Sequence, residues 1–176
     1  MRLCGKEEKM AIRNIRIEND EILRKKCREI TEMTPKLRIL IDDMLETMYE
    51  ASGVGLAAPQ VGILRRIVVI DVGDEHGPIV LVNPVILETS GSQTGGEGCL
   101  SIPGKTATVT RPNYAKVKGF DRDMNEIVIE GTGLLARAIC HECDHLEGVL
   151  YIDKAESEVM DTDKYYGRDS EEQEQE

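Results

Sequence analysis

The sequence TGLLARAICHECDHLEG, residues 132–148, decides the fold that we predict for this chain. Its apolar residues recur at helical spacing, Thr132 is of the type that caps a helix start, and Gly148 is of the type that follows a helix end. Residues four apart lie on one face of a helix, so His141 and His145 can bind a single metal ion. The apolar run that leads into the two histidines predicts that this helix is buried.

The metal motif is completed by a carboxylate and by a ligand that the helix does not supply. Glu142 lies about 100° round the helix from His141, where it can take a proton from water at the open side of the metal. Downstream, Tyr151 stands where one class of zinc peptidase has a third histidine, and a neutral phenol is a poor substitute. Upstream, Cys99 lies in a glycine-rich segment, and Cys4 and Cys27 are the other upstream thiols. We therefore expect an upstream thiolate as the third ligand.

The segments outside this helix predict an α+β fold. A helix is expected from Thr34 and Pro35 up to Gly53, because apolar residues recur there at helical spacing. Residues 53–62 are expected to form a loop or short strand. Strands are expected at the following ranges: 66–71, 79–87, 105–120 as a hairpin or strand pair, and 127–129. We predict small mixed or antiparallel β-sheets packed around the central helix that carries the metal motif.

Composition and charge limit the class of protein. The chain has 176 residues, of which 40% are hydrophobic, and this suits one domain with a core. The formal net charge of −11 argues against DNA and against an anionic membrane surface as partners. The N-terminal residues contain no apolar signal-peptide core, and the five cysteines have no disulfide framework spacing. We expect a cytoplasmic protein with reduced thiols.

The chain divides into three predicted parts. Residues 1–9 are polar and aperiodic, and Met10 is a second candidate start, so we expect an N-terminal extension there. Residues 10–153 form the predicted catalytic domain. Residues 154–176 form an acidic tail that we expect to be at least partly disordered, because ten acidic and three basic residues lie from Asp153 onward.

Three short segments carry the most specific information. They are GVGLAAPQ at 53–60, EGCLS at 97–101 and HECDH at 141–145. Together and in this order they resemble the three signature motifs of the peptide deformylase family. The resemblance covers residues 10–153, and includes LVNP at 81–84 and LEGVL after the second histidine.

This resemblance implies a metal site and an activity. It implies one ion per chain held by Cys99, His141 and His145, with water in the fourth position. It also implies Fe²⁺ as the physiological ion, with Zn²⁺, Ni²⁺ or Co²⁺ as substitutes. Independently, a thiolate and two imidazoles suit borderline-soft divalent ions, and three protein ligands with one open position is the catalytic arrangement.

The implied reaction removes the N-formyl group from the N-terminal formyl-Met of newly made polypeptides and releases formate. Glu142 accepts the proton of water and passes it to the leaving amine. The counterparts of the family's oxyanion donors are the side-chain amide of Gln60 and the backbone N–H of Leu100. The implied partners are nascent formyl-Met peptides, with transient proximity to the ribosome and with no DNA or membrane.

Further positions match residues that bind substrate or support the site. Gly55 corresponds to a position that hydrogen-bonds an extended substrate through its backbone. The counterparts of the residues that line an apolar pocket for the Met side chain are Val54, Leu134 and Ala138. Glu97 and Arg111 match positions that form an ion pair beneath the motif.

Two alternatives fit part of the pattern. A zinc peptidase would cleave internal peptide bonds and needs a third ligand downstream of the helix motif. A metal-stabilised binding module would need a fourth protein ligand, such as a second cysteine, and would have no use for Glu142.

Overall fold

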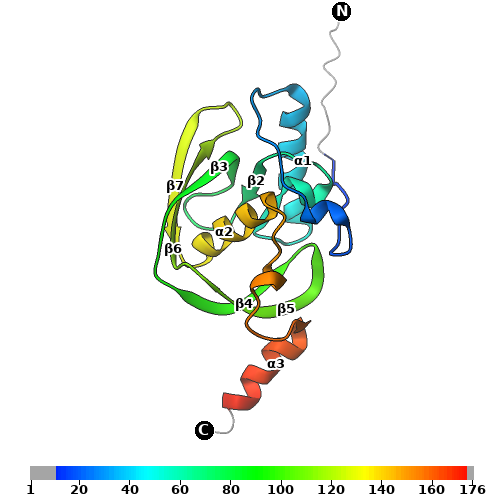
Figure 1. Ribbon diagram of the computed structural model, residues 1–176, viewed down its shortest axis with the longest axis vertical. Coiled ribbons are helices and arrows are strands. Elements are labelled where there is room, and N and C mark those ends of the chain that lie inside the picture. Colours follow the sequence, from blue (N-terminus) through cyan, green and yellow to red (C-terminus); the bar gives the residue numbers. More distant parts are fainter. Residues whose placement is uncertain (1–10, 174–176) are drawn as a thin grey trace, which may run out of the picture.

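Two antiparallel sheets enclose one helix. The computed structural model describes the backbone of residues 11–173 and the side chains of residues 11–167. The larger sheet has the order β1-β2-β3-β6-β7, and the smaller sheet has the order β4-β5-β8 (Figure 1). The strands are β1 (Gly55–Ala57), β2 (Ile67–Ile70), β3 (Ile79–Ser90), β4 (Gln93–Cys99), β5 (Ile102–Arg111), β6 (Tyr114–Phe120), β7 (Glu126–Thr132) and β8 (Met160–Asp161). All pairs of named strands are antiparallel, so the predicted α+β class is confirmed.

Strand β2 is buried on both faces, which explains why its sequence is a continuous apolar run. Val68 and Ile70 pack in the core cluster that contains α2 (Leu134–Leu146). Ile67 and Val69 point the other way, into the cluster that contains α1 (Pro35–Glu50). The first strands of the larger sheet are therefore covered by α2 on one face and by α1 on the other.

Helix α1 forms where its sequence signals predict. The side chain of Thr34 accepts a hydrogen bond from the Leu37 N–H at 3.2 Å, and Pro35 occupies the first turn. The buried face of the helix carries Leu40, Ile41, Met44 and Met48. The helix ends at Glu50, three residues before the predicted glycine.

Helix α2 lies between the two sheets, against β1, β2, β6 and β7 on one side and near β5 on the other (Figure 1). The predicted cap at Thr132 is wrong, because Thr132 still pairs with Tyr114 at the end of β7. Gly133, with φ +61°, makes the turn from strand to helix. Gly148 follows the helix with φ +74°, and a Cβ atom there would lie 2.5 Å from the Arg24 carbonyl oxygen, so a side chain would not fit.

The structure contains regular elements in two segments for which the sequence predicted none. The glycine-rich segment before Cys99 is strand β4, which pairs with β5. Within the predicted acidic tail, β8 pairs with β5 and leads into α3 (Thr162–Gln173).

The predicted N-terminal extension, 1–9, and the final residues 174–176 lie outside the described residues. Three short 3-10 helices, Glu21–Arg24, Ala58–Val61 and Tyr151–Lys154, complete the described elements. Among the described helices, none is long and apolar enough to cross a membrane.

Candidate metal centre and active site

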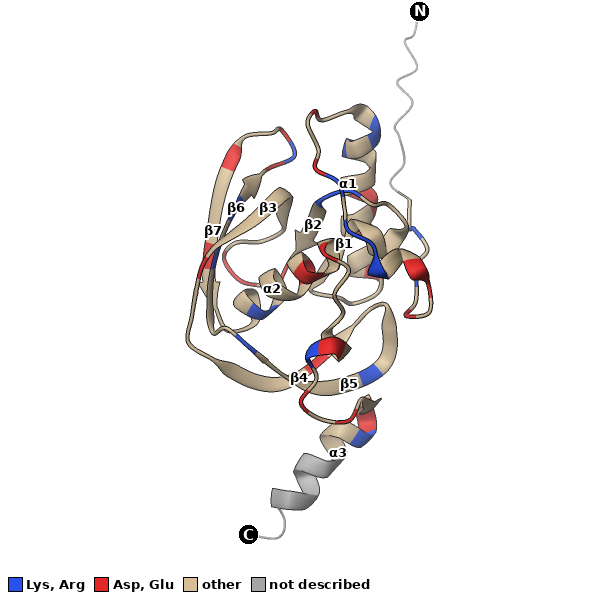
Figure 2. Ribbon diagram, in the orientation of Figure 1, with Lys and Arg blue, Asp and Glu red and all other residues tan. Residues whose placement is uncertain are grey.

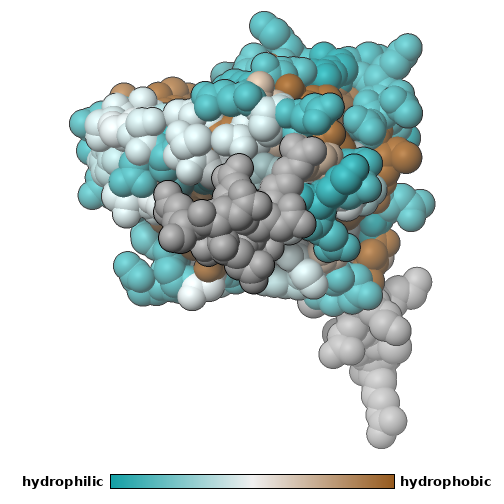
Figure 3. Space-filling model, turned by 90° about the horizontal axis from the view of Figure 1, so that it is seen from below, coloured by the Kyte–Doolittle hydropathy of each residue, from teal (hydrophilic) through white to brown (hydrophobic). Residues whose placement is uncertain are grey.

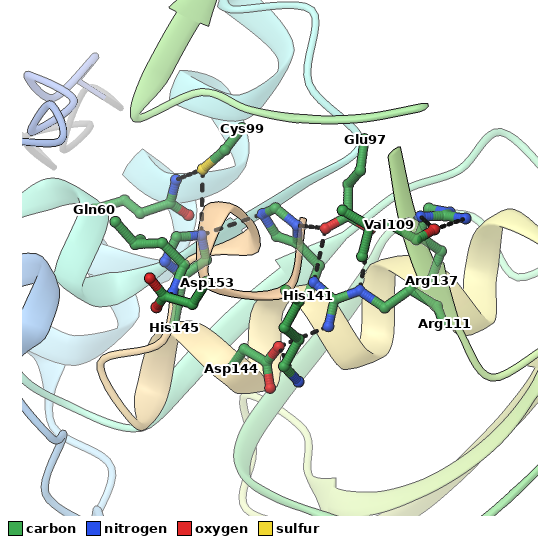
Figure 4. Close-up of polar contacts among 12 residues, drawn as sticks. Gln60, Glu97, Cys99, Val109, Arg111, Arg137, His141, Asp144, His145 and Asp153 are labelled. Carbon is green, nitrogen blue, oxygen red and sulfur yellow. Dashed lines mark hydrogen bonds and ion pairs between the residues drawn. The ribbon is translucent and has the colours of Figure 1, made fainter. Parts of the chain in front are cut away.

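Three predicted ligands converge where α2 faces the end of β4. Cys99 is the last residue of β4, and His141 and His145 project from successive turns of α2 (Figure 4). The Cys99 Sγ and one ring nitrogen of each histidine all lie within 4.8 Å of one another. His141 and His145 are 8% and 1% exposed, so the histidine side of the cluster is shielded from solvent.

The spacing of these atoms fits a tetrahedral ion. With ordinary metal–ligand bond lengths, two nitrogen ligands lie about 3.3 Å apart, and a sulfur and a nitrogen lie about 3.6 Å apart. The two Nε2 atoms are 3.2 Å apart, and the Cys99 Sγ lies 3.4 Å from Nε2 of His145. Burial lowers the pKa of His145, with smaller contributions from His141 and Arg111, and this favours the neutral imidazole that a metal requires.

Glu97 fixes the orientation of His141. Nδ1 of His141 lies 2.8 Å from Oε2 of Glu97, and because an ionised carboxylate only accepts, Nδ1 is the donor. Nε2 of His141 is then the ring nitrogen that faces His145, and in the neutral imidazole it carries the lone pair that a metal binds. Burial opposes ionisation of Glu97, but its hydrogen bonds to His141 and Arg111 outweigh burial and hold its pKa well below the usual range. Such a carboxylate–histidine pair is the usual support of a metal-binding imidazole.

Two arginines and a second carboxylate complete this buried network. Arg111 donates to both oxygens of Glu97 at 3.1 and 2.7 Å, as the predicted ion pair requires. Arg137 donates to Oε1 of Glu97 at 2.8 Å and to the Val109 carbonyl. Asp144 accepts from Arg111 at 2.6 Å and pairs with Lys154 at 2.9 Å. These contacts of Arg137 and Asp144 could not be predicted from the sequence, since no spacing rule relates α2 to β4 and β5.

Glu142 lies beside the triad and is 4% exposed. Its Oε2 has no hydrogen-bond partner among the described residues, and a Cβ atom at Gly55 would overlap with its Oε1. Burial raises the pKa of this carboxyl to about 7, while the neighbouring His141 acts in the opposite direction. A carboxyl with one free oxygen and a pKa near neutrality is suited to accept and return a proton.

Gln60 and Leu100 border the same space. Gln60 is almost fully buried, and its Oε1 accepts from the Ala57 N–H at 2.9 Å, which fixes the direction of the amide. Its Nε2 therefore faces Ser101 Oγ at 3.0 Å and Cys99 Sγ at 3.5 Å. Leu100 follows Cys99 and packs over Gly53.

A cleft of about 650 Å³ opens over these groups. The predicted substrate-binding residues all line it: Val54, Gly55, Leu134 and Ala138. Val54 and Leu134 are 40% and 50% exposed, so both present apolar surface to the cleft. The structure thus brings every predicted site residue to one place.

A model of the polypeptide deformylase family matches residues 12–160 of the chain. The peptide deformylase of Agathobacter rectalis is 66% identical over 152 residues, which cover 86% of this chain and 95% of that protein. The peptide deformylase of Lachnoclostridium phytofermentans is 60% identical over 166 residues, which cover 94% of this chain and 100% of that protein.

Solved structures agree with these sequence relatives. The peptide deformylase of Thermotoga maritima superposes with a TM-score of 0.78 at 42% identity, covering 82% of this chain and 97% of that one. The enzyme of Legionella pneumophila gives a TM-score of 0.79 at 39% identity, covering 94% and 99%. At these identities the likeness extends beyond the fold.

Proposed function

This chain belongs to the polypeptide deformylase family, and we propose that Cys99, His141 and His145 hold the metal ion on which its reaction depends. The enzyme is a hydrolase that removes the N-formyl group from newly made polypeptides. The observation that carries the proposal is the convergence of one Sγ and two Nε2 atoms beside the free oxygen of Glu142. When bound, the ion supplies Lewis-acid chemistry: it polarises a carbonyl oxygen and lowers the pKa of water.

Fe²⁺ is the ion that we propose for the enzyme in the cell, with Zn²⁺, Ni²⁺ or Co²⁺ as substitutes. A thiolate with two imidazoles suits borderline-soft divalent ions of this group. The thiolate lowers the formal charge of the site from +2 to +1. This makes the ion a weaker Lewis acid, but the ion can still lower the pKa of water.

Glu142 is the proposed proton carrier. It accepts a proton from water as the formyl carbon is attacked, and it returns that proton to the nitrogen of the leaving peptide. Gly55 leaves the space in which the carboxylate lies, and burial keeps the carboxylate away from bulk solvent.

Gln60 and Leu100 are the proposed donors to the oxyanion. The Gln60 amide is held with its N–H groups toward Cys99, because its carbonyl oxygen is occupied by the Ala57 N–H. The Leu100 N–H is the second donor. Each such donor contributes about 3 kcal/mol in related chemistry because it is aimed before the charge develops.

The formyl-Met residue lies between two sheet edges in this proposal. β1 ends the larger sheet and β4 ends the smaller one, so both offer unpaired backbone groups toward the cleft. Val54, Leu134 and Ala138 line the pocket for the Met side chain.

All of these groups fall within residues 10–153, the proposed catalytic domain. We place the reaction in the cytoplasm, near ribosomes, because formylated chains are made there.

Formate release from a formyl-Met peptide tests the proposal. The protein is prepared without oxygen, its metal content is measured, and it is compared with Glu142→Ala and Cys99→Ser. We expect Glu142→Ala to retain its ion and lose roughly 10²- to 10⁴-fold in kcat, and Cys99→Ser to bind the ion poorly. Near-native turnover by Glu142→Ala would rule out this mechanism, and cleavage of internal peptide bonds would indicate a peptidase.

A further inference from the structure

Arg137 is the only lysine or arginine in α2, and it is buried (Figure 2). Hydrophilic residues cover much of the surface that is seen from the α3 end, where charged side chains are usually found (Figure 3). Arg137, in contrast, is 9% exposed, and its neighbours Ala136 and Ala138 are buried as well. A buried guanidinium has lost its contacts with water, so it needs hydrogen-bond partners within the protein.

The Arg137 guanidinium has these partners in two strands of the smaller sheet. Its Nη1 donates to Oε1 of Glu97 in β4 at 2.8 Å. Its Nη1 and Nη2 both lie 3.3 Å from the carbonyl oxygen of Val109 in β5. The residue also lines the cleft, together with Leu134 and Ala138 of the same helix. Arg137 is therefore at once a wall of the cleft and a fixed donor to Glu97.

Glu97 accepts four hydrogen bonds, and they divide evenly between β5 and α2. Arg111 of β5 donates one to each carboxylate oxygen. From α2, Arg137 donates to Oε1 and His141 donates to Oε2. Arg137 and His141 are four residues apart, so they lie on one face of the helix, one turn from each other. The carboxylate thus spans one turn of α2, with one oxygen at each end.

Water has little access to this carboxylate. The side chains of Glu97 and Arg111 are 5% and 2% exposed, and that of Arg137 is 11% exposed. In an exposed ion pair, solvent replaces a donor that is removed. Around Glu97 it does so poorly, and the loss of one donor falls on the donors that remain.

We propose that Arg137 is a positioning residue for the metal ligand His141 and that it acts through Glu97. Its hydrogen bond to Oε1 holds the carboxylate in register with α2, and this keeps Oε2 within hydrogen-bond distance of Nδ1 of His141. Without Arg137, His141 itself is the only donor from α2 to Glu97 among the described residues, and the carboxylate can turn toward Arg111. The imidazole then loses the partner that fixes its ring. This inference rests on the proposed function, since it takes His141 as a ligand.

Arg137→Met tests the proposal, because it keeps an unbranched side chain at the wall of the cleft and removes the donors. The full-length protein is freed of metal without oxygen and titrated with Co²⁺ against a competing chelator. We expect Arg137→Met to bind Co²⁺ about 10- to 100-fold more weakly than wild type, the usual effect of losing a group behind a metal-binding histidine. The visible absorption of the bound Co²⁺ should also change, because the orientation of one imidazole ligand is altered.

Kinetics on the fully loaded protein separate positioning from substrate binding. With formyl-Met-Ala as substrate, we expect kcat of Arg137→Met to fall while KM changes little, since the new side chain still lines the cleft. Arg137→Lys keeps a cation that can donate to Oε1, and it should recover part of the lost Co²⁺ affinity.

The matched control is Arg66→Met. Arg66 also donates to a carboxylate and to a backbone carbonyl, those of Glu147 at 2.7 Å and Pro84 at 3.4 Å, but it takes no part in the Glu97 network. This variant should bind Co²⁺ like wild type. An equal loss of affinity in Arg66→Met and Arg137→Met would overturn the inference, because any lost ion pair would then have the same effect.

A double-mutant cycle shows whether Arg137 acts through Glu97. In a Glu97→Gln background, Arg137→Met should cause little further loss of Co²⁺ affinity, because the intermediary is already changed. Fully additive losses would overturn the inference, as would wild-type affinity and absorption in Arg137→Met alone. If Arg137→Met does not fold, Arg137→Gln takes its place in the cycle.

Failure of the proposed function has a different signature. A wild-type protein that bound no Co²⁺, or that released no formate from formyl-Met-Ala when loaded, would overturn the metal site or the reaction itself. Unchanged metal binding in the Arg137 variants would leave both intact.

Discussion

Gly55 and Glu142 share one small space: a Cβ atom added at Gly55 would overlap with the carboxylate of Glu142. Gly55 of β1 is buried and pairs with Ile70 of β2, so the strand cannot move aside easily. The glycine therefore positions the proton carrier as well as leaving its own backbone open to the cleft. Sequence comparison with the family suggested only the second role.

Gly55→Ala tests this relationship. We expect kcat for a formyl-Met peptide to fall about a hundredfold or more, because the carboxylate is pushed from its place, while the metal content stays near one ion per chain. Gly95→Ala is the matched control in β4, since its Cβ would meet only the Arg137 guanidinium at 3.8 Å. A Gly55→Ala enzyme within threefold of wild type would show that the carboxylate is free to relocate.

Glu97→Gln should weaken both the fold and the metal site. Glu97 is 6% exposed and compensates the charges of Arg111 and Arg137 while it orients His141. Removing one partner of a buried ion-pair network costs about 3–5 kcal/mol, and loss of a carboxylate behind a metal-binding histidine lowers metal affinity about 10- to 100-fold. Denaturant unfolding and metal titration measure the two effects.

The control for that prediction is an exposed ion pair. Lys105 and Asp161 also lie 2.6 Å apart, but Asp161 is largely exposed. Asp161→Asn should leave the free energy of unfolding close to the wild-type value, because water screens an exposed ion pair. Equal losses in the Glu97 and Asp161 variants would contradict the buried-network explanation.

Two variants of Tyr151 distinguish the contribution of packing to stability from that of hydrogen bonding beneath the metal site. Its ring stacks on His141, with centroids 6.2 Å apart and planes inclined by 23°, and it is 1% exposed. Its hydroxyl is buried and has no partner among the described residues. We expect Tyr151→Ala to lose about 3–5 kcal/mol of stability and Tyr151→Phe to be at least as stable as wild type. Thermal or denaturant unfolding distinguishes them, and a clear loss in Tyr151→Phe would reveal a hydrogen bond through buried water.

Removal of the metal should expose one thiol selectively. Burial raises the pKa of Cys27 to about 11 and that of Cys143 to about 12, and it also raises the pKa of Cys140. At pH 8, below each of these pKa values, the three thiols are protonated and react slowly with iodoacetamide. Cys99 lines the cleft and should be alkylated quickly after chelation and slowly in the metal-loaded protein.

Site-resolved mass spectrometry follows each cysteine separately. Raising the pH toward 11 should accelerate labelling of Cys27, because its thiolate forms only in that range. Rapid labelling of Cys99 in the metal-loaded enzyme would argue against its role as a ligand.

The elements that the sequence predicted correctly have local causes. Thr34 and Pro35 specify the start of α1 by themselves, and the spacing of His141 and His145 depends only on helix geometry. Thr132 carries the same capping chemistry as Thr34, yet its pairing with Tyr114 in the sheet prevails. A local signal fails where a partner distant in the chain competes for the same backbone.

The elements that the sequence missed depend on distant partners. Strand β4 contains three glycines, which disfavour a strand, and it forms because β5 pairs with it. The acidic composition after Asp153 predicted partial disorder where the structure has β8 and α3. These two elements are held by side-chain contacts with Lys105, Thr106 and Thr108 of β5. The contacts of Arg137 and Asp144 were equally inaccessible, because Glu97 and Arg111 reach them from other elements.

The proposed metal ligands belong to two separate layers of the molecule, with Cys99 on the smaller sheet and both histidines on α2. An ion bound by all three ties the β4–β5 hairpin to the central helix. Its binding energy therefore also opposes separation of the two layers: each tenfold rise in free-ion concentration above the dissociation constant adds about 1.4 kcal/mol to the stability of the joined state. We therefore expect the unfolding midpoint of the protein to rise with the concentration of free metal ion.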